Sequence, residues 1–144
     1  MTENTASTHW TGDVTDGKGE LTLVTSGAGS FTVSLPARAA TVAGTTNPEE
    51  LIAAAHSACL AMHFTAVLRE HDLVAESTEV SATVRQAKTP DGFAITGIAL
   101  RLEALVDGLD DGTFQELAAI AEKTCPLSKA LSATPITLSA SLLG

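Results

Sequence analysis

The chain has 144 residues, of which 44% are hydrophobic and 17% charged, which suits one globular domain and excludes a disordered chain. The formal net charge of −9 opposes binding to nucleic acid or to an anionic membrane surface, because both require a positive field. An aromatic content of 3% also leaves few side chains that could stack on bases. We therefore expect neither a nucleic-acid partner nor a membrane partner.

The N-terminal residues 1–7 have neither the positive start nor the apolar run of a secretory signal. No apolar stretch is expected to reach the roughly 18 residues that a membrane span needs. The chain is therefore expected to remain in the cytoplasm, where reducing conditions keep its two cysteines, Cys59 and Cys125, as free thiols.

The first third of the chain alternates short β-type runs with glycine-containing turns. This pattern predicts a three-stranded meander over residues 9–35, with strands at 9–14, 19–26 and 30–35. A looser segment follows over residues 36–46, in which Arg38 is the only charged side chain.

A strong helix start follows this segment. Asn47 is the expected N-cap, Pro48 suits the first helical position, and Glu50 is placed to complete a capping box. The helix expected over residues 48–70 is apolar nearly all round, which is typical of a buried helix. A second subunit is the easiest source of the cover that a small domain lacks, so we expect a homodimer.

The apolar pattern then changes to a period of two, which predicts a long antiparallel hairpin over residues 76–106. On its second strand Ile98, Leu100 and Leu102 share the buried face, with Arg101 and Glu103 facing out.

Helices are expected over residues 113–133, with Thr113 as the first N-cap. Pro126 must break this region, and it suits the start of a second short helix with Cys125 at its N-cap. A closing strand is expected over residues 134–143. The order of elements predicts one α+β domain over residues 1–144, with mainly antiparallel sheets packed on a central buried helix.

The two cysteines are the candidate reactive residues. Burial of Cys59 in a nearly uncharged helix raises its pKa and leaves an unreactive thiol unless a cation compensates. Arg38 is the candidate cation, since no other arginine precedes the helix. Cys125, at a helix N-terminus, lies near free backbone N–H groups, an environment that also favours redox activity.

Two stretches resemble the signature motifs of the OsmC/Ohr peroxidase family, TNPEELIAAAHSAC at residues 46–59 and CPLSKAL at residues 125–131. The likeness extends to residues 9–13 and 92–96, covers almost the whole chain, and favours the OsmC branch. It implies an OsmC-like fold in an intertwined homodimer with active sites at the subunit interface. It also implies an antioxidant enzyme of the hyperosmotic and oxidative stress response, which reduces organic hydroperoxides without haem, flavin, metal or other cofactor.

By this resemblance Cys59 is the peroxidatic thiol and Cys125 the resolving thiol of a redox-active disulfide, which an external thiol or dithiol reduces. Arg38 would stabilise the thiolate, and Glu49 would hold the arginine. Glu49 precedes Cys59 by ten residues, about 15 Å along one helix axis. One link of the relay from Glu49 through Arg38 to Cys59 is therefore expected to cross the dimer interface.

Apolar side chains around the central helix predict an apolar pocket, which favours alkyl or lipid hydroperoxides over hydrogen peroxide. Met62 and Phe64 are candidates to line it, although core packing is the commoner role for such residues.

Three alternatives stay open. His56, Cys59 and His63 share one helix face and could form a structural or hydrolytic zinc site with Cys125. Either histidine could instead serve Cys59 as the base of an acyl-transfer enzyme, although packing or hydrogen bonding is the default role for both. The third alternative is a dimeric binding protein without catalysis.

Overall fold

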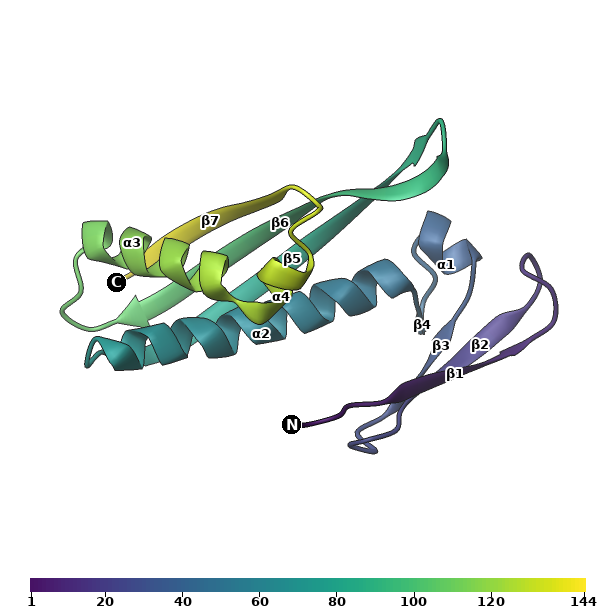
Figure 1. The fold of residues 1–144 in the computed structure, drawn as a ribbon, viewed down its shortest axis with the longest axis horizontal. Helices are drawn as coiled ribbons and strands as arrows, with labels where there is room; N and C mark the ends of the chain where they lie inside the picture. Colours follow the sequence, from purple (N-terminus) through teal and green to yellow (C-terminus); the bar gives the residue numbers. More distant parts are fainter. The chain divides into compact units, whose positions relative to one another are not determined.

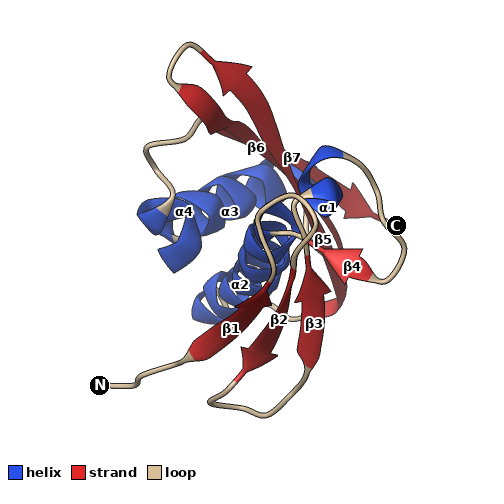
Figure 2. Cartoon of the chain, turned by 90° about the vertical axis from the view of Figure 1, so that its right-hand side faces the viewer, coloured by secondary structure: helices blue, strands red, loops and turns tan.

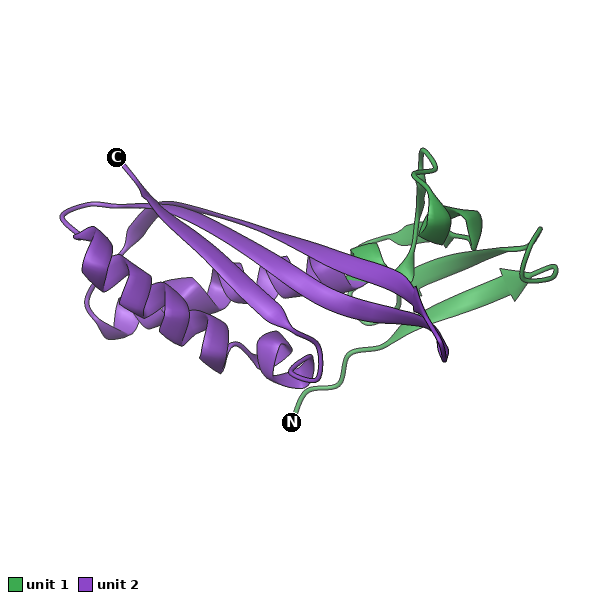
Figure 3. Cartoon of the chain, turned by 90° about the horizontal axis from the view of Figure 1, so that it is seen from above, with its two compact units in different colours: residues 1–51 green, residues 52–144 purple.

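The computed structural model describes residues 1–144 and divides into two compact units, Met1–Leu51 and Ile52–Gly144 (Figure 3). The boundary falls in the first turn of a 23-residue helix, α2 (Pro48–Glu70), which begins and ends where the sequence predicted. The elements are of the expected α+β class. The expectation of one domain over residues 1–144 stays a prediction.

The first unit is a sheet in the order β1-β2-β3-β4. The predicted meander is present, with antiparallel strands β1 (Ala6–Thr11), β2 (Lys18–Leu23) and β3 (Ser30–Val33). The short strand β4 (Thr45–Thr46) pairs parallel to β3. The segment expected to be loose also contains a helical turn, α1 (Pro36–Ala39), because Pro36 starts it with a fixed backbone angle.

The second unit has two layers, with α2, α3 and α4 covering one face of a sheet in the order β5-β6-β7 (Figures 1 and 2). The predicted hairpin is present as β5 (Ala75–Thr89) and β6 (Gly92–Val106), which pair antiparallel. The closing strand β7 (Ile136–Leu143) pairs with β6 in parallel.

Two helices connect β6 to β7. The first, α3 (Asp111–Thr124), begins earlier than predicted, because the Asp110 carboxylate accepts from the Thr113 backbone N–H at 2.9 Å. Thr113 is therefore not the N-cap; the Asp110 carboxylate caps the helix instead. As predicted, the chain breaks at Pro126, which starts α4 (Pro126–Ala130) and leaves Cys125 at its N-cap.

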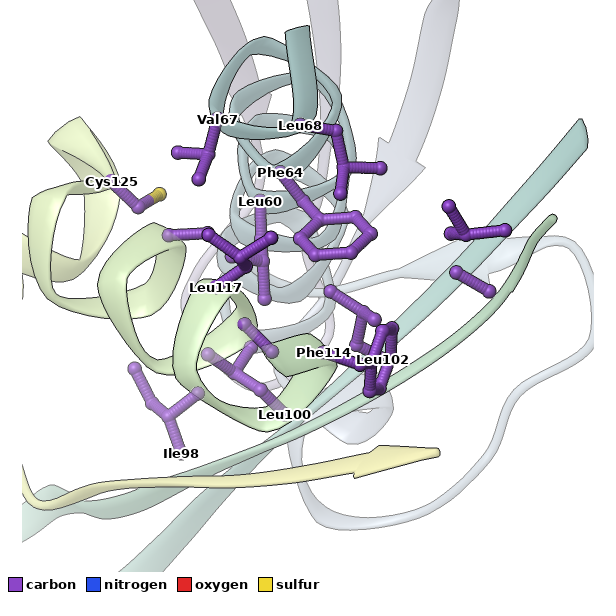
Figure 4. Packing of buried hydrophobic residues seen from close by; sticks show 14 residues of the cluster. Leu60, Phe64, Val67, Leu68, Ile98, Leu100, Leu102, Phe114, Leu117 and Cys125 are labelled. Atoms are coloured by element: carbon purple, nitrogen blue, oxygen red, sulfur yellow. The ribbon is translucent and has the colours of Figure 1, made fainter. Parts of the chain in front are cut away.

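The core of the second unit lies between its helices and the sheet (Figure 4). The Phe64 ring of α2 meets the Phe114 ring of α3 edge-on, with centroids 5.7 Å apart. The predicted inward face of β6 is confirmed: Ile98, Leu100 and Leu102 are buried against these helices. Burial of each such side chain stabilises the fold by about 1.5–3 kcal/mol.

Burial of α2 is one-sided within a single chain, whereas the sequence predicted burial all round. Leu60, Phe64 and Leu68 are fully buried, but Met62 keeps 68% of its surface exposed. By length and composition α2 could cross a membrane, so the expectation that no stretch reaches that length was wrong. Its buried face nevertheless makes it the core helix of a soluble protein.

Candidate active site

The two cysteines face each other in the second unit. Cys125 Sγ lies 3.3 Å from Cys59 Sγ, although 66 positions separate them in the sequence. Both are free thiols, and Cys125 is fully buried at the start of α4. The two sulfur atoms of a disulfide are about 2.05 Å apart. The Cys59 and Cys125 sulfurs would therefore need to move only about 1 Å closer to form one.

Burial raises the pKa of Cys59 above the ordinary thiol value. A hydrogen bond from the backbone N–H of Leu127, in the first turn of α4, works in the opposite direction and lowers it. The neighbouring Cys125 raises the pKa of Cys59 again. The net effect within the second unit is a raised pKa, which disfavours the thiolate of Cys59, so a nearby cation would favour its ionisation. The sequence predicted free N–H groups at this helix start beside Cys125, whereas in the structure one of them, that of Leu127, reaches Cys59.

Arg38 and Glu49 form a bidentate ion pair within the first unit. Arg38 Nη2 donates to Glu49 Oε1 at 2.6 Å, and Arg38 Nε donates to Glu49 Oε2 at 3.2 Å. The hydrogen bond from Arg38 lowers the pKa of Glu49, and the same bond raises the pKa of Arg38, so both groups stay charged. The pairing that the resemblance implied is present, whereas its role toward Cys59 stays a prediction.

Asn47 fixes the two segments that carry this ion pair. Its side-chain amide donates to the Ala37 carbonyl at 2.8 Å, and its Oδ1 accepts from the Glu50 backbone N–H at 2.8 Å. The second bond is the predicted N-cap of α2. One side chain thus joins α1, which carries Arg38, to the helix turn that carries Glu49.

Replacing Glu49 by Gln should remove a stabilising interaction that depends on pH. The pKa of Glu49 is lowered from 4.5 in the folded chain, so the contribution is fully present above that value and is lost as pH falls through the lowered pKa. Because 39% of the Arg38 side chain is exposed, we expect a difference of only about 1 kcal/mol at pH 7. Urea unfolding of both proteins at decreasing pH measures it, and a difference that does not shrink in acid would contradict the assignment.

A pocket of about 350 Å³ lies beside Arg38 in the first unit. Its wall is mostly apolar and consists of Trp10, Val14, Val33, Ser34, Leu35, Arg38 and Pro48. Pro48 is the only residue of the central helix α2 that lines it, and an apolar pocket around the rest of that helix stays a prediction. Phe64 belongs to the core and Met62 is exposed, so neither lines the pocket beside Arg38.

Trp10 is fixed in this wall by its hydrogen bonds and by a glycine opposite. Its indole N–H points to the carbonyls of Gly12 and Asp13, at 3.0 and 3.2 Å. Gly19 is its cross-strand partner, and a Cβ there would lie 3.0 Å from the indole ring. Sequence reasoning noticed Trp10 only as part of a family-like stretch, because its place in a pocket depends on strand register.

The two histidines beside Cys59 have partners other than sulfur. His56 Nε2 is hydrogen-bonded to Ser128 Oγ at 2.8 Å, and His63 Nε2 to Thr124 Oγ1 at 2.7 Å. No group of three or more His, Cys, Asp or Glu side chains in the chain is arranged to hold a metal ion. The geometry therefore supports neither the zinc site nor the acyl-transfer base, and it agrees with the default role of hydrogen bonding.

The central helix α2, buried on one side, and the short helix α4, which begins at Pro126, present two facing thiols and so define a small dithiol protein. Residues 41–140 match the family model described as OsmC-like protein, and the chain belongs to the OsmC family.

Relatives and solved structures agree with this assignment. Peroxiredoxin OsmC of Escherichia coli is 39% identical over 125 residues, which cover 87% of each chain. An organic hydroperoxide resistance protein OsmC from Legionella pneumophila has a similar structure, with a TM-score of 0.75, 27% identity, and coverage of 99% of this chain and 98% of that one. The organic hydroperoxide resistance protein OhrB of Bacillus subtilis gives a TM-score of 0.70 at 30% identity, over 95% and 98% of the two chains.

Proposed function

We propose that this chain is a thiol-dependent peroxidase that reduces organic hydroperoxides to alcohols and protects the cell against oxidative stress. The observation that carries the proposal is the 3.3 Å contact between the sulfurs of Cys59 and Cys125. The names of the relatives support it, since one is a peroxiredoxin and others are organic hydroperoxide resistance proteins.

In the first step the Cys59 thiolate attacks the distal oxygen of the hydroperoxide. The O–O bond breaks, the alkoxide takes up a proton and leaves as the alcohol, and Cys59 becomes a sulfenic acid. Sulfur is oxidised by two electrons and the peroxide bond receives them, so no metal or organic cofactor is required.

In the second step Cys125 attacks the sulfenic sulfur of Cys59. A disulfide forms and the sulfenic oxygen leaves as water, which protects Cys59 from irreversible oxidation. An external thiol or dithiol in the cytoplasm then reduces the disulfide and returns both thiols.

Arg38 is assigned to keep Cys59 ionised and to stabilise the charge that develops on the leaving oxygen. Glu49 holds the guanidinium by its two hydrogen bonds. We propose that the protein is a homodimer in which Arg38 of one subunit serves Cys59 of the other. The exposed apolar side of α2, with Met62 at 68% exposure, supports a second copy as its cover.

Intact mass spectrometry tests the proposed function directly. Protein treated with one equivalent of cumene hydroperoxide should lose two hydrogen atoms and regain them on incubation with dithiothreitol. Protein that forms neither a disulfide nor any oxidised cysteine would contradict the proposal.

The pocket beside Arg38 should select apolar hydroperoxides. Trp10→Ala removes the largest apolar surface of its wall, so we expect kcat/KM for cumene hydroperoxide to fall about tenfold, equivalent to about 1.4 kcal/mol of lost apolar contact. The rate with hydrogen peroxide should be nearly unchanged, because that substrate has no apolar group to bury.

Phe31→Ala is the matched control for Trp10→Ala. Phe31 is also a partly exposed aromatic residue of the same sheet, but it does not line the pocket. Steady-state kinetics of both variants with both peroxides decide the point, and equal losses with cumene hydroperoxide and hydrogen peroxide would contradict this assignment of the pocket.

A further inference from the structure

A buried hydrogen bond joins the helices that carry the two thiols. His56 Nε2 of α2 and Ser128 Oγ of α4 are 2.8 Å apart, and the two residues are 0% and 5% exposed. His56 precedes Cys59 by three residues and Ser128 follows Cys125 by three, so the bond lies one helical turn from each thiol.

We propose that His56 and Ser128 are positioning residues, which hold α4 against α2 so that Cys125 captures the sulfenic acid at Cys59 before a second peroxide does. The inference rests on the proposed peroxidase function. It concerns the second step of the reaction, and it assigns neither residue a direct contact with substrate.

The short helix α4 depends on tertiary contacts such as this hydrogen bond to keep its position. It has only five residues, too few to be stable without tertiary contacts. Capture of the sulfenic acid requires the Cys125 sulfur to move closer than 3.3 Å to the Cys59 sulfur, so a small displacement of α4 would delay the disulfide.

The hydrogen bond to Ser128 is the only one that the His56 ring makes. Nδ1 of the ring is buried without a hydrogen-bond partner, so Ser128 is the only polar side chain that fixes the imidazole. Loss of Ser128 would leave both ring nitrogens buried and unpaired, which is costly. Burial lowers the pKa of His56, partly offset by Glu122 of α3, so the ring is neutral and acts by geometry rather than by charge.

The chain contains a matched control for this bond. His63 of α2 and Thr124 of α3 make the same kind of contact at 2.7 Å, on the other side of the thiols. Thr124 is exposed, so water can replace its hydroxyl when it is lost. Ser128→Ala and Thr124→Val therefore each remove one hydroxyl, one from a buried bond and one from an exposed bond.

The test measures how Cys59 partitions between disulfide and sulfinic acid. Wild type, Ser128→Ala and Thr124→Val are treated with a tenfold excess of cumene hydroperoxide, and intact mass distinguishes loss of two hydrogens from gain of two oxygens. We expect the ratio of sulfinic acid to disulfide to rise about fivefold to tenfold in Ser128→Ala, and to stay at the wild-type value in Thr124→Val.

Rescue separates positioning from a general loss of folding. His56→Gln keeps a polar group near the place of Nε2 and should restore most of the wild-type ratio, whereas His56→Leu should behave like Ser128→Ala. A wild-type ratio in both Ser128→Ala and His56→Leu would overturn the inference, as would an equal rise in Thr124→Val. Wild-type protein in which Cys59 is not oxidised at all would instead overturn the proposed peroxidase function.

Discussion

Replacing Cys59 by Ser is expected to abolish the reduction of cumene hydroperoxide, with a fall in turnover on the order of 10⁴-fold or more. A serine hydroxyl stays protonated at neutral pH and attacks the peroxide oxygen far more weakly than a thiolate does. A coupled assay with dithiothreitol as the reductant measures the effect. Full activity in Cys59→Ser would show that the wrong residue has been assigned to the peroxide.

Cys125→Ser is the informative companion, because it leaves Cys59 in place. We expect this variant to reduce one equivalent of hydroperoxide per site in forming the sulfenic acid and a second as excess peroxide converts it to sulfinic acid, after which turnover stops. Intact mass after treatment should show added oxygen on Cys125→Ser and a disulfide in wild type. A disulfide in Cys125→Ser would have to join two chains and would contradict the resolving role.

Replacing Arg38 by Met is expected to lower kcat/KM for cumene hydroperoxide by about 10²- to 10³-fold. Burial raises the pKa of Cys59, so without a cation only a small fraction of the thiol is ionised at neutral pH. The alkylation rate of Cys59 by iodoacetamide, followed against pH, should therefore rise at a higher pH in Arg38→Met than in wild type. Arg85→Met, which removes an exposed arginine of β5, is the control and should leave both measurements unchanged.

Mixed dimers test whether Arg38 acts across the subunit interface. When Arg38→Met and Cys59→Ser proteins are unfolded and refolded together, half of the dimers contain one copy of each variant. If Arg38 serves the partner's thiol, each such dimer has one complete site, and activity should recover to about a quarter of the wild-type rate. No recovery, in a sample shown to contain mixed dimers, would place Arg38 and Cys59 of a working site in the same subunit.

Local signals in the sequence were enough to predict most of the elements. Asn47 and Pro48 determine the start of α2 through contacts within one turn, so its bounds were predicted correctly. The alternation of Ile98, Leu100 and Leu102 likewise identified the buried face of β6. The parallel pairing of β7 with β6 was not predicted, because it depends on how the intervening helices return the chain to the sheet.

In the candidate site, too, local motifs were predictive, whereas contacts between distant segments were not. The motifs around Cys59 and Cys125 pointed to both thiols, and the structure brings their sulfurs together. The partner of His56 could not be predicted, because Ser128 lies 72 positions away and is brought near only by the packing of α4 on α2. The position of Trp10 could not be predicted either, because it depends on the register of β1 and β2, which places Gly19 opposite the indole.

The chain places its two facing thiols and its paired guanidinium in different compact units: both sulfurs belong to Ile52–Gly144, and Arg38 with Glu49 to Met1–Leu51. The stability of the disulfide and the speed of the attack on peroxide can therefore be altered by substitutions in separate parts of the sequence. Selection, or a protein engineer, could thus change the peroxide rate through Met1–Leu51 without replacing any residue beside the two sulfurs.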